Sequence, residues 1–231
     1  MAYEFVRRAD DMVMCRLDPQ EKAIIAQVAQ EVSDLIRADL GMGEEPEAVR
    51  EAAGSDDPLA RLEAEFAVDS PREPRDSAVR RLFPAASEED PALAEEFRRL
   101  GQGDLASGKL SALGVVQRSI DRVGPTAAEI VLDEEAATAW LTGLNDMRLV
   151  LADRLSLRDD EDLDTLRMLQ QIAEDAGIDG DDLERAAGGT PEGADASGGD
   201  DGPTAAGPDL VLAVYDLLTW LQESLVRVVA R

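Results

Sequence analysis

The C-terminal segment from Leu210 to Val229 constrains the fold most strongly, because leucine, valine and aromatic side chains occupy nearly all faces of the helix that it predicts. A helix that is apolar all round is buried either in a protein core or in a membrane. Charged side chains such as Arg227 interrupt this segment, and a charge at bilayer depth costs roughly 2.5 kcal/mol or more. We therefore expect a core helix over residues 209–230 that packs against another apolar helix.

The segment that follows Asp133 is the expected partner of this helix. Asp133 is a candidate N-cap, and leucines at helical spacing from Leu141 to Leu155 predict one apolar stripe, which Trp140, Met147 and Val150 widen. Between the two apolar helices, residues 159–208 are strongly acidic, and their last part lacks any apolar anchor. We expect this stretch to be an acidic, partly disordered insertion.

The N-terminal half predicts a β-hairpin followed by further helices. Residues 3–17 form two short alternating runs around a turn, and residues 18–21 (Asp-Pro-Gln-Glu) are typical of a helix start with a capping box. Residues 129–132 are β-branched and fit either a strand or an extended lead-in. Helical spacing predicts helices at about 18–41, 59–66, 77–83, 91–100 and 105–122. The prediction is a mostly α single domain over residues 1–231, with the hairpin packed on a helical core at 19–158.

Composition excludes several kinds of chemistry. The chain has no histidine and one cysteine, which excludes Ser-His-Asp and Cys-His triads, histidine-containing zinc sites, and Cys₄ zinc or iron–sulfur sites. Residues Gly103–Lys109 have the spacing of a phosphate-binding loop, but Leu110 stands where a Ser or Thr would hold magnesium. We expect no catalytic residues, no metal and no cofactor, and so no enzyme.

The charge balance bears on possible partners. With 50 acidic and 23 basic residues, the net charge is −27, which disfavours autonomous DNA binding because an acidic surface repels phosphates. Charges near the N-terminus, where a signal peptide would be apolar, predict a cytoplasmic protein, and we expect no membrane association. One candidate anion-facing patch is present, although ordinary solvated helix faces explain it as well; it comprises Arg72, Arg75, Arg80, Arg81, Arg98 and Arg99.

Three further residues are candidates for specific roles. Cys15 could sense oxidants through a sulfenic acid or a mixed or intermolecular disulfide if it were exposed and had a lowered pKa. The pattern favours the alternative that Cys15 is a small buried hydrophobe on the strand face of Val13 and Leu17. Asn145 and Arg148 lie one turn apart in an apolar helix, and they could form a buried polar network or line a groove for a partner.

Several runs of this sequence resemble a known family. The runs Trp140–Leu151 and Tyr215–Val226, with the shorter Ala78–Pro84 and Glu96–Leu100, resemble an actinobacterial family of unknown-function domain proteins. Some of its members are named AosR, oxidative-stress transcriptional regulator. The resemblance implies a non-enzymatic, redox-responsive regulator that works with a stress sigma factor. Sensing in that family is associated with two N-terminal cysteines, whereas this chain has Cys15 alone.

The leading hypothesis is a redox-responsive transcriptional regulator of the oxidative-stress response. It would act through protein–protein contact with a sigma factor or RNA polymerase, and would reach DNA only indirectly or weakly. The alternative is a non-redox helical adaptor or scaffold with the same core, which would keep its partner after a Cys15→Ser substitution. A metal-dependent enzyme is disfavoured because the sequence lacks histidine and any convergent carboxylate pattern. Homodimer formation is left open.

Overall fold

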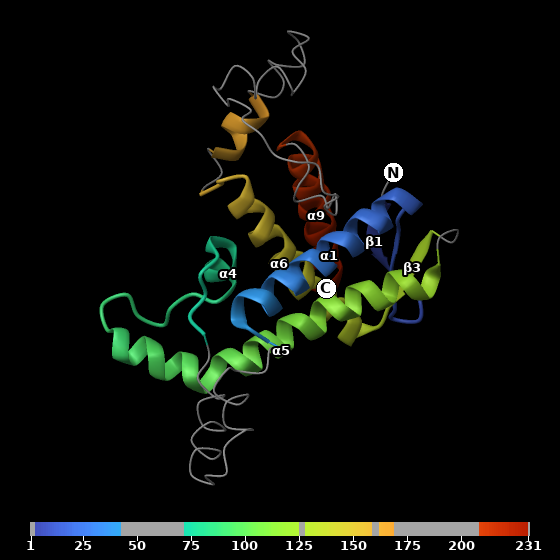
Figure 1. The fold of residues 1–231 in the computed structure, drawn as a ribbon. Coiled ribbons are helices and arrows are strands. Elements are labelled where there is room, and N and C mark those ends of the chain that lie inside the picture. The colour runs from blue at the N-terminus through green and yellow to red at the C-terminus, as the bar shows by residue number, and fades with distance from the viewer. Residues whose placement is uncertain (1–2, 43–71, 125–127, 159–161, 169–207, 231) are drawn as a thin grey trace, which may run out of the picture.

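A computed structural model describes residues 3–42, 72–124, 128–158, 162–168 and 208–230 of the chain. Most of these residues are helical, and the strands among them form one small sheet (Figure 1). The elements are β1 (Tyr3–Arg7), β2 (Val13–Arg16), α1 (Pro19–Leu40), α4 (Ser77–Leu82), α5 (Pro91–Val123), β3 (Glu129–Leu132), α6 (Glu134–Arg154) and α9 (Pro208–Val229), with a short helix over 162–168 before α9. The predicted mostly helical fold with an N-terminal hairpin is confirmed.

The sheet is antiparallel, with β2 between β1 and β3. In the β2–β3 ladder Val13 pairs with Leu132 and Cys15 pairs with Ile130. All four side chains are buried, so this face of the sheet belongs to the core. Residues 129–132 are therefore a strand, which settles the alternative that the sequence left open.

Aspartates begin the helices at the predicted places. Asp18 accepts hydrogen bonds from the backbone N–H groups of Gln20 and Glu21, both at 2.9 Å. The Glu21 carboxylate in turn accepts one from the Asp18 N–H at 2.8 Å, which completes the capping box. At the start of α6, Asp133 accepts a hydrogen bond from the Ala136 N–H at 2.8 Å. Both predicted helix starts are confirmed.

One prediction about the helices is wrong. Residues 91–100 and 105–122 do not form two helices, because α5 runs without interruption from Pro91 to Val123. The phosphate-loop-like spacing at Gly103–Lys109 therefore lies inside a helix, where the backbone N–H groups point along the axis and cannot form an anion-binding loop.

The junction between the two predicted helices shows why the helix continues. A Cβ built at Gly101 or Gly103 meets nothing within 4 Å, so neither glycine is required by a turn or a close contact. Between them Gln102 is buried, and its Nε2 donates a hydrogen bond to the Arg72 backbone oxygen at 2.8 Å. This contact helps to offset the cost of glycine inside a helix, which is about 1 kcal/mol per residue.

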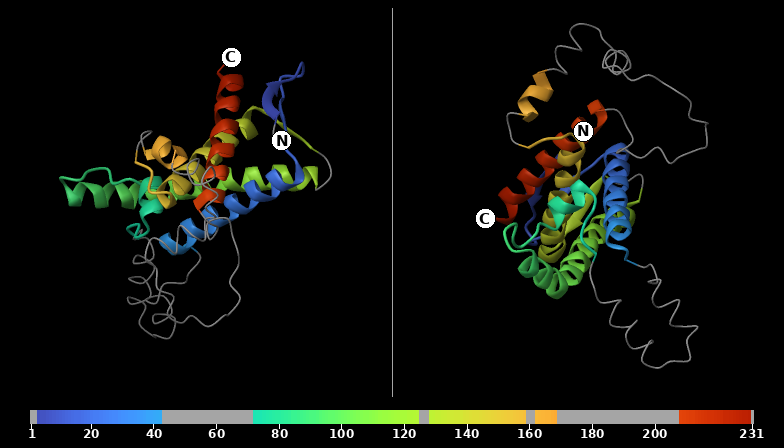
Figure 2. Two further views of the ribbon diagram at one scale, coloured as in Figure 1. Left: turned by 90° about the horizontal axis from the view of Figure 1, so that it is seen from above. Right: turned by 60° about the vertical axis from the view of Figure 1, so that its left-hand side comes forward.

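Helix α6 is the centre of the packing. It contacts α1, α4, α5 and β3, and α9 packs along it as predicted while also reaching β1 (Figure 2). Trp140 of α6 is fully buried and meets the Phe5 ring edge-on, with ring centroids 5.9 Å apart. Leu218 and Leu221 of α9 are fully buried in the same core. The apolar C-terminal helix is thus a core helix.

Helices α5 and α6 approach one another closely at Gly143. A Cβ built at this buried glycine would lie 3.0 Å from Cγ2 of Val116 and 3.7 Å from the Ala112 carbonyl oxygen. The missing side chain therefore lets the two helix backbones come together at this crossing.

Two predicted segments lie wholly or mostly outside the described residues: the helix at 59–66 and the acidic insertion at 159–208. Of the latter, residues 162–168 are described and are helical. Within the described part of the chain, no helix has both the length and the apolar character needed to cross a membrane.

Candidate functional site

Cys15 lies on the central strand of the sheet, with its side chain in the core. Its relative exposure is 1%, beside Val13 and Leu17 on the same strand face. Burial, reinforced by the negative charge of Glu21, raises the pKa of the Cys15 thiol to about 12. A redox-sensing thiol needs solvent access and a lowered pKa. The geometry therefore favours the interpretation of Cys15 as a small core hydrophobe.

Arg148 connects α6 to α9. Its guanidinium donates hydrogen bonds to Oε1 of Gln222 at 2.6 Å and to the Tyr215 hydroxyl at 3.3 Å, and it lies 5.3 Å from the centre of the Tyr215 ring. Asn145 is exposed. The two side chains therefore lie in different environments, and one buried network of Asn145 with Arg148 stays a prediction. The partners of Arg148 come from α9.

The buried polar contact of α6 is made by a different residue, Asp146. Its Oδ1 lies 2.6 Å from Nζ of Lys109 on α5, and the two side chains are 1% and 13% exposed. Lys109 also lies 5.9 Å from the centre of the Phe83 ring. Burial raises the pKa of Asp146 and outweighs the opposing effects of Lys109 and Asn145. The sequence places Lys109 and Asp146 37 residues apart, and no motif links them.

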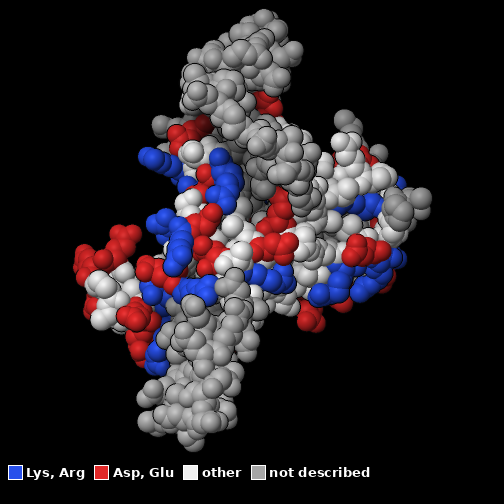
Figure 3. Space-filling view, in the orientation of Figure 1, with Lys and Arg blue, Asp and Glu red and all other residues white. Residues whose placement is uncertain are grey.

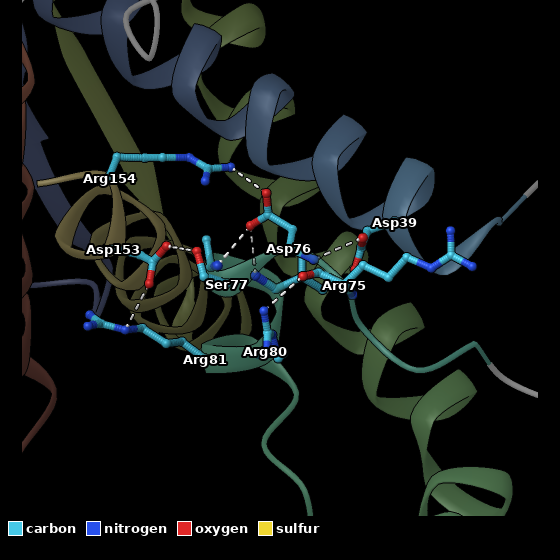
Figure 4. A network of polar contacts seen from close by, with 10 residues as sticks. Asp39, Arg75, Asp76, Ser77, Arg80, Arg81, Asp153 and Arg154 are labelled. Atoms are coloured by element: carbon cyan, nitrogen blue, oxygen red, sulfur yellow. Dashed lines mark hydrogen bonds and ion pairs between the residues drawn. The ribbon is translucent and has the colours of Figure 1, made fainter. Parts of the chain in front are cut away.

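The predicted basic patch contains a network of internal contacts (Figure 4). Asp39 of α1 accepts hydrogen bonds from the backbone N–H groups of Arg75 and Asp76 at 3.0 and 3.2 Å. Asp76 caps α4 by accepting from the Ala78 N–H at 2.8 Å, and it accepts from Nη2 of Arg154 at 2.9 Å. Burial raises the pKa of Asp76, but these hydrogen bonds and the Arg154 charge outweigh burial, so its pKa lies below the usual value.

A second part of the network joins α4 to the end of α6. The Asp153 carboxylate accepts a hydrogen bond from the Ser77 hydroxyl and forms an ion pair with Nε of Arg81 at 3.2 Å. Nη2 of Arg81 also donates to the Leu157 backbone oxygen at 2.8 Å. Each of these groups thus has a partner within the chain, and their evident role is to hold α4 against α6.

The outer members of the predicted patch are also near carboxylates. Arg99 donates to Glu96 at 2.8 Å, and Arg98 lies 3.8 Å from Glu73. On the face shown in Figure 3, basic side chains are interspersed with acidic ones and do not form a large patch of one sign. The contacts favour the interpretation of these arginines as members of solvated, charge-paired helix faces.

A groove of about 940 Å³ runs between α5 and α6. Its α5 side extends from Asp104 to Val115, and its α6 side extends from Asp133 to Thr142. Several lining residues are apolar or small, and they are Leu105, Gly108, Ala112, Val115 and Ala139. Ala112 is buried and Val115 and Ala139 are half-buried, so they form an apolar floor.

Four exposed carboxylates also line this groove. Asp104 comes from α5, Asp133 is the N-cap of α6, and Glu134 and Glu135 come from the first turn of α6. Negative charge at a helix N-terminus also has a structural explanation, since the helix dipole favours it. Asp104 has no such explanation, because it lies within α5. Lys109 is the cationic residue of the lining, and Asp146 balances its charge. We call this feature the acidic groove.

Across the described ranges, no group of three or more His, Cys, Asp or Glu side chains is arranged to hold a metal ion. The acidic groove combines an apolar floor with a negative rim, and this combination suits a ligand that is both apolar and positively charged.

The chain is a member of the family called domain of unknown function DUF2017, whose sequence model matches residues 2–229. Neither a comparison with curated proteins nor one with solved structures finds a match.

Proposed function

We propose that this protein acts by binding another protein, as a helical adaptor without enzymatic chemistry of its own. The observation that carries the proposal is the acidic groove, which the carboxylates of Asp104, Asp133, Glu134 and Glu135 line together with an apolar floor. A groove between two helices can accept the apolar face of a partner helix or extended segment. Basic side chains beside that face would meet the rim and set orientation and association rate.

The finer proposal is that this partner belongs to the transcription machinery. The resemblance to proteins named AosR supports a regulator that contacts a sigma factor or RNA polymerase, which also means a cytoplasmic location. A basic segment on either protein would complement the acidic groove, whereas the net charge of −27 disfavours direct contact with DNA. The buried Cys15 thiol supports the form of the proposal in which binding is independent of redox state.

A peptide titration tests the proposed groove. A fluorescently labelled amphipathic Leu/Lys peptide is titrated with the full chain, beside a Leu/Glu peptide of the same apolar pattern. We expect the Leu/Lys peptide to bind and its affinity to fall with added salt, because the rim carboxylates are exposed. The double variant Glu134→Lys, Glu135→Lys should weaken binding by roughly tenfold or more, which corresponds to about 1.4 kcal/mol per factor of ten.

The matched control is Glu88→Lys with Glu89→Lys, which changes the net charge equally at exposed positions outside the groove. Retained affinity in this control would place binding at the groove. Equal losses in both variants, or equal binding of the two peptides, would contradict the proposal. The wild type, the groove variant and the control variant can also be titrated with a purified stress sigma factor and with RNA polymerase. This titration tests the proposal that the partner belongs to the transcription machinery.

A further inference from the structure

The first turns of α5 extend away from the other helices, as both Figure 1 and Figure 2 show. This part of the helix carries large apolar side chains in solvent, with Leu93 45% exposed, Phe97 58% and Leu100 66%. Steps of four and three residues place all three on one face of the helix, within about 60° of its circumference at 100° per residue. We call this surface the α5 apolar face.

The spacing of this face is that of a helix–helix seam. Apolar residues separated by four and three positions are the pattern with which two helices interlock side chains along a shared line. A cluster of exposed large apolar side chains rimmed by charge marks an interaction site more often than a single exposed leucine does. Among the described residues, no helix packs along the α5 apolar face, although its spacing is that of a helix–helix contact.

The charges beside the face indicate which partner fits. At 100° per residue, Glu96 and Arg99 lie on the same flank of the apolar face. They form an ion pair at 2.8 Å within α5, with side chains 53% and 55% exposed. Arg98 points to the opposite side, where it lies 3.8 Å from Glu73. An exposed pair of this kind contributes little to stability, so Glu96 and Arg99 can exchange partners at small cost.

These positions are self-complementary. When two copies of the helix run antiparallel about a two-fold axis at Phe97, Leu93 of one copy meets Leu100 of the other. The flank that carries Glu96 and Arg99 on one helix then faces the same flank of the other helix. Glu96 of each copy faces Arg99 of the other, so the interface contains two such ion pairs. A two-fold interface of this type joins one patch to itself and closes without further growth.

We propose that a second copy of this chain docks on the α5 apolar face, forming an antiparallel α5–α5 dimer. The proposal goes beyond adaptor function and does not depend on it, because the acidic groove begins at Asp104 and uses the following part of α5. The occupant is a second copy because one two-fold axis pairs Leu93 with Leu100 and also pairs Glu96 with the oppositely charged Arg99.

Sedimentation velocity of the full chain over a wide concentration range tests the dimer. The wild type should dimerise, and Phe97→Glu should be monomeric at the same concentrations, because it places a carboxylate in the seam. Unchanged circular dichroism and melting temperature are expected for this variant, since Phe97 is exposed. A monomeric wild type, or a Phe97→Glu variant that dimerises like the wild type, would overturn the proposal.

Charge reversal gives a test that does not depend on folding of one variant. Glu96→Arg leaves only positive charge on the flank, and Arg99→Glu leaves only negative charge. Each variant alone should dimerise roughly tenfold more weakly, because two like-charge contacts replace two ion pairs. An equimolar mixture should form a heterodimer more tightly than either variant forms a homodimer, since both contacts become attractive. A mixture no tighter than its components would rule out the antiparallel arrangement.

Binding of the Leu/Lys peptide separates the two proposals. Phe97→Glu should retain that binding while losing the dimer, whereas Glu134→Lys with Glu135→Lys should lose the peptide and retain the dimer. A peptide that binds only to the dimer would contradict the independence of the two sites.

Discussion

Nζ of Lys109 lies 2.6 Å from Oδ1 of Asp146, so a buried ion pair joins α5 to α6 beneath the acidic groove. The Asp146 side chain is 1% exposed, and its Oδ2 has no hydrogen-bond partner among the described residues. The pair has two consequences for the groove. It fixes the two helices that form the walls, and it cancels the one positive charge of the lining.

Breaking this pair should destabilise the protein strongly. Lys109→Met would leave the Asp146 carboxylate buried without its cation, and we expect the free energy of unfolding to fall by about 3–5 kcal/mol. Replacing both partners, as Lys109→Met with Asp146→Leu, should cost less than Lys109→Met alone, because no buried charge is then left unpaired. Urea unfolding at pH 7 measures the free energy of unfolding of the single and the double variant. A double variant that is less stable than the single one would contradict this account.

The raised pKa of Asp146 predicts that the stability of the protein depends on pH. The pKa of Asp146 is higher in the folded state than its ordinary value of 3.8, so the folded state binds the proton more tightly. The contribution of Asp146 to stability is therefore largest below pH 3.8 and declines as pH rises through the folded-state pKa. Asp146→Asn removes this titration. The difference in unfolding free energy, wild type minus Asp146→Asn, should fall with rising pH, and a difference that grows would have the wrong sign.

Asp76 should show the opposite dependence. Its pKa is lowered in the folded state by the hydrogen bond from Arg154 and by the cap of α4, despite burial. The charge of Asp76 therefore stabilises the fold above pH 3.8, and this stabilisation is lost as pH falls through the folded-state pKa. Asp76→Ala should cost about 1 kcal/mol from the cap alone at pH 7. Asp76→Asn retains an oxygen that can cap α4, so it should be the milder variant in thermal unfolding.

Cys15 should be unreactive in the folded protein. With a thiol pKa of about 12 and 1% exposure, almost no accessible thiolate exists even at pH 9. We expect iodoacetamide to modify Cys15 slowly in buffer and rapidly in urea, and peroxide to produce no covalent dimer. Fast modification below pH 8, followed on intact mass, would restore redox sensing as a function of this chain. Cys15→Ala should cost about 1 kcal/mol in stability.

Local signals in the sequence predicted much of the fold. The capping box at Asp18 and the N-cap at Asp133 depend on side chains within three residues of the backbone groups that they bind, so the sequence contains the whole contact. The uniformly apolar C-terminal segment likewise predicted burial, because such a helix has no face that tolerates water.

Contacts between distant residues were not predictable in this way. Gln102 in the middle of α5 meets the Arg72 backbone, and the buried ion pair depends on the crossing of α5 over α6. The sequence analysis selected Asn145 and not Asp146 as a candidate for a buried polar contact. Helix α6 is covered by several elements, so more than one of its faces is buried. Apolar periodicity then no longer shows which of two adjacent polar residues faces the core. The acidic groove needs both helices and has no sequence signature.

Hydrogen exchange measured by mass spectrometry, with and without saturating Leu/Lys peptide, tests most directly whether the protein binds a partner at the acidic groove. We expect protection to increase in peptides covering residues 104–115 of α5 and 133–142 of α6, and Glu134→Lys with Glu135→Lys to abolish the increase. Protection spread over other acidic surfaces, or equal protection in this double variant, would contradict it.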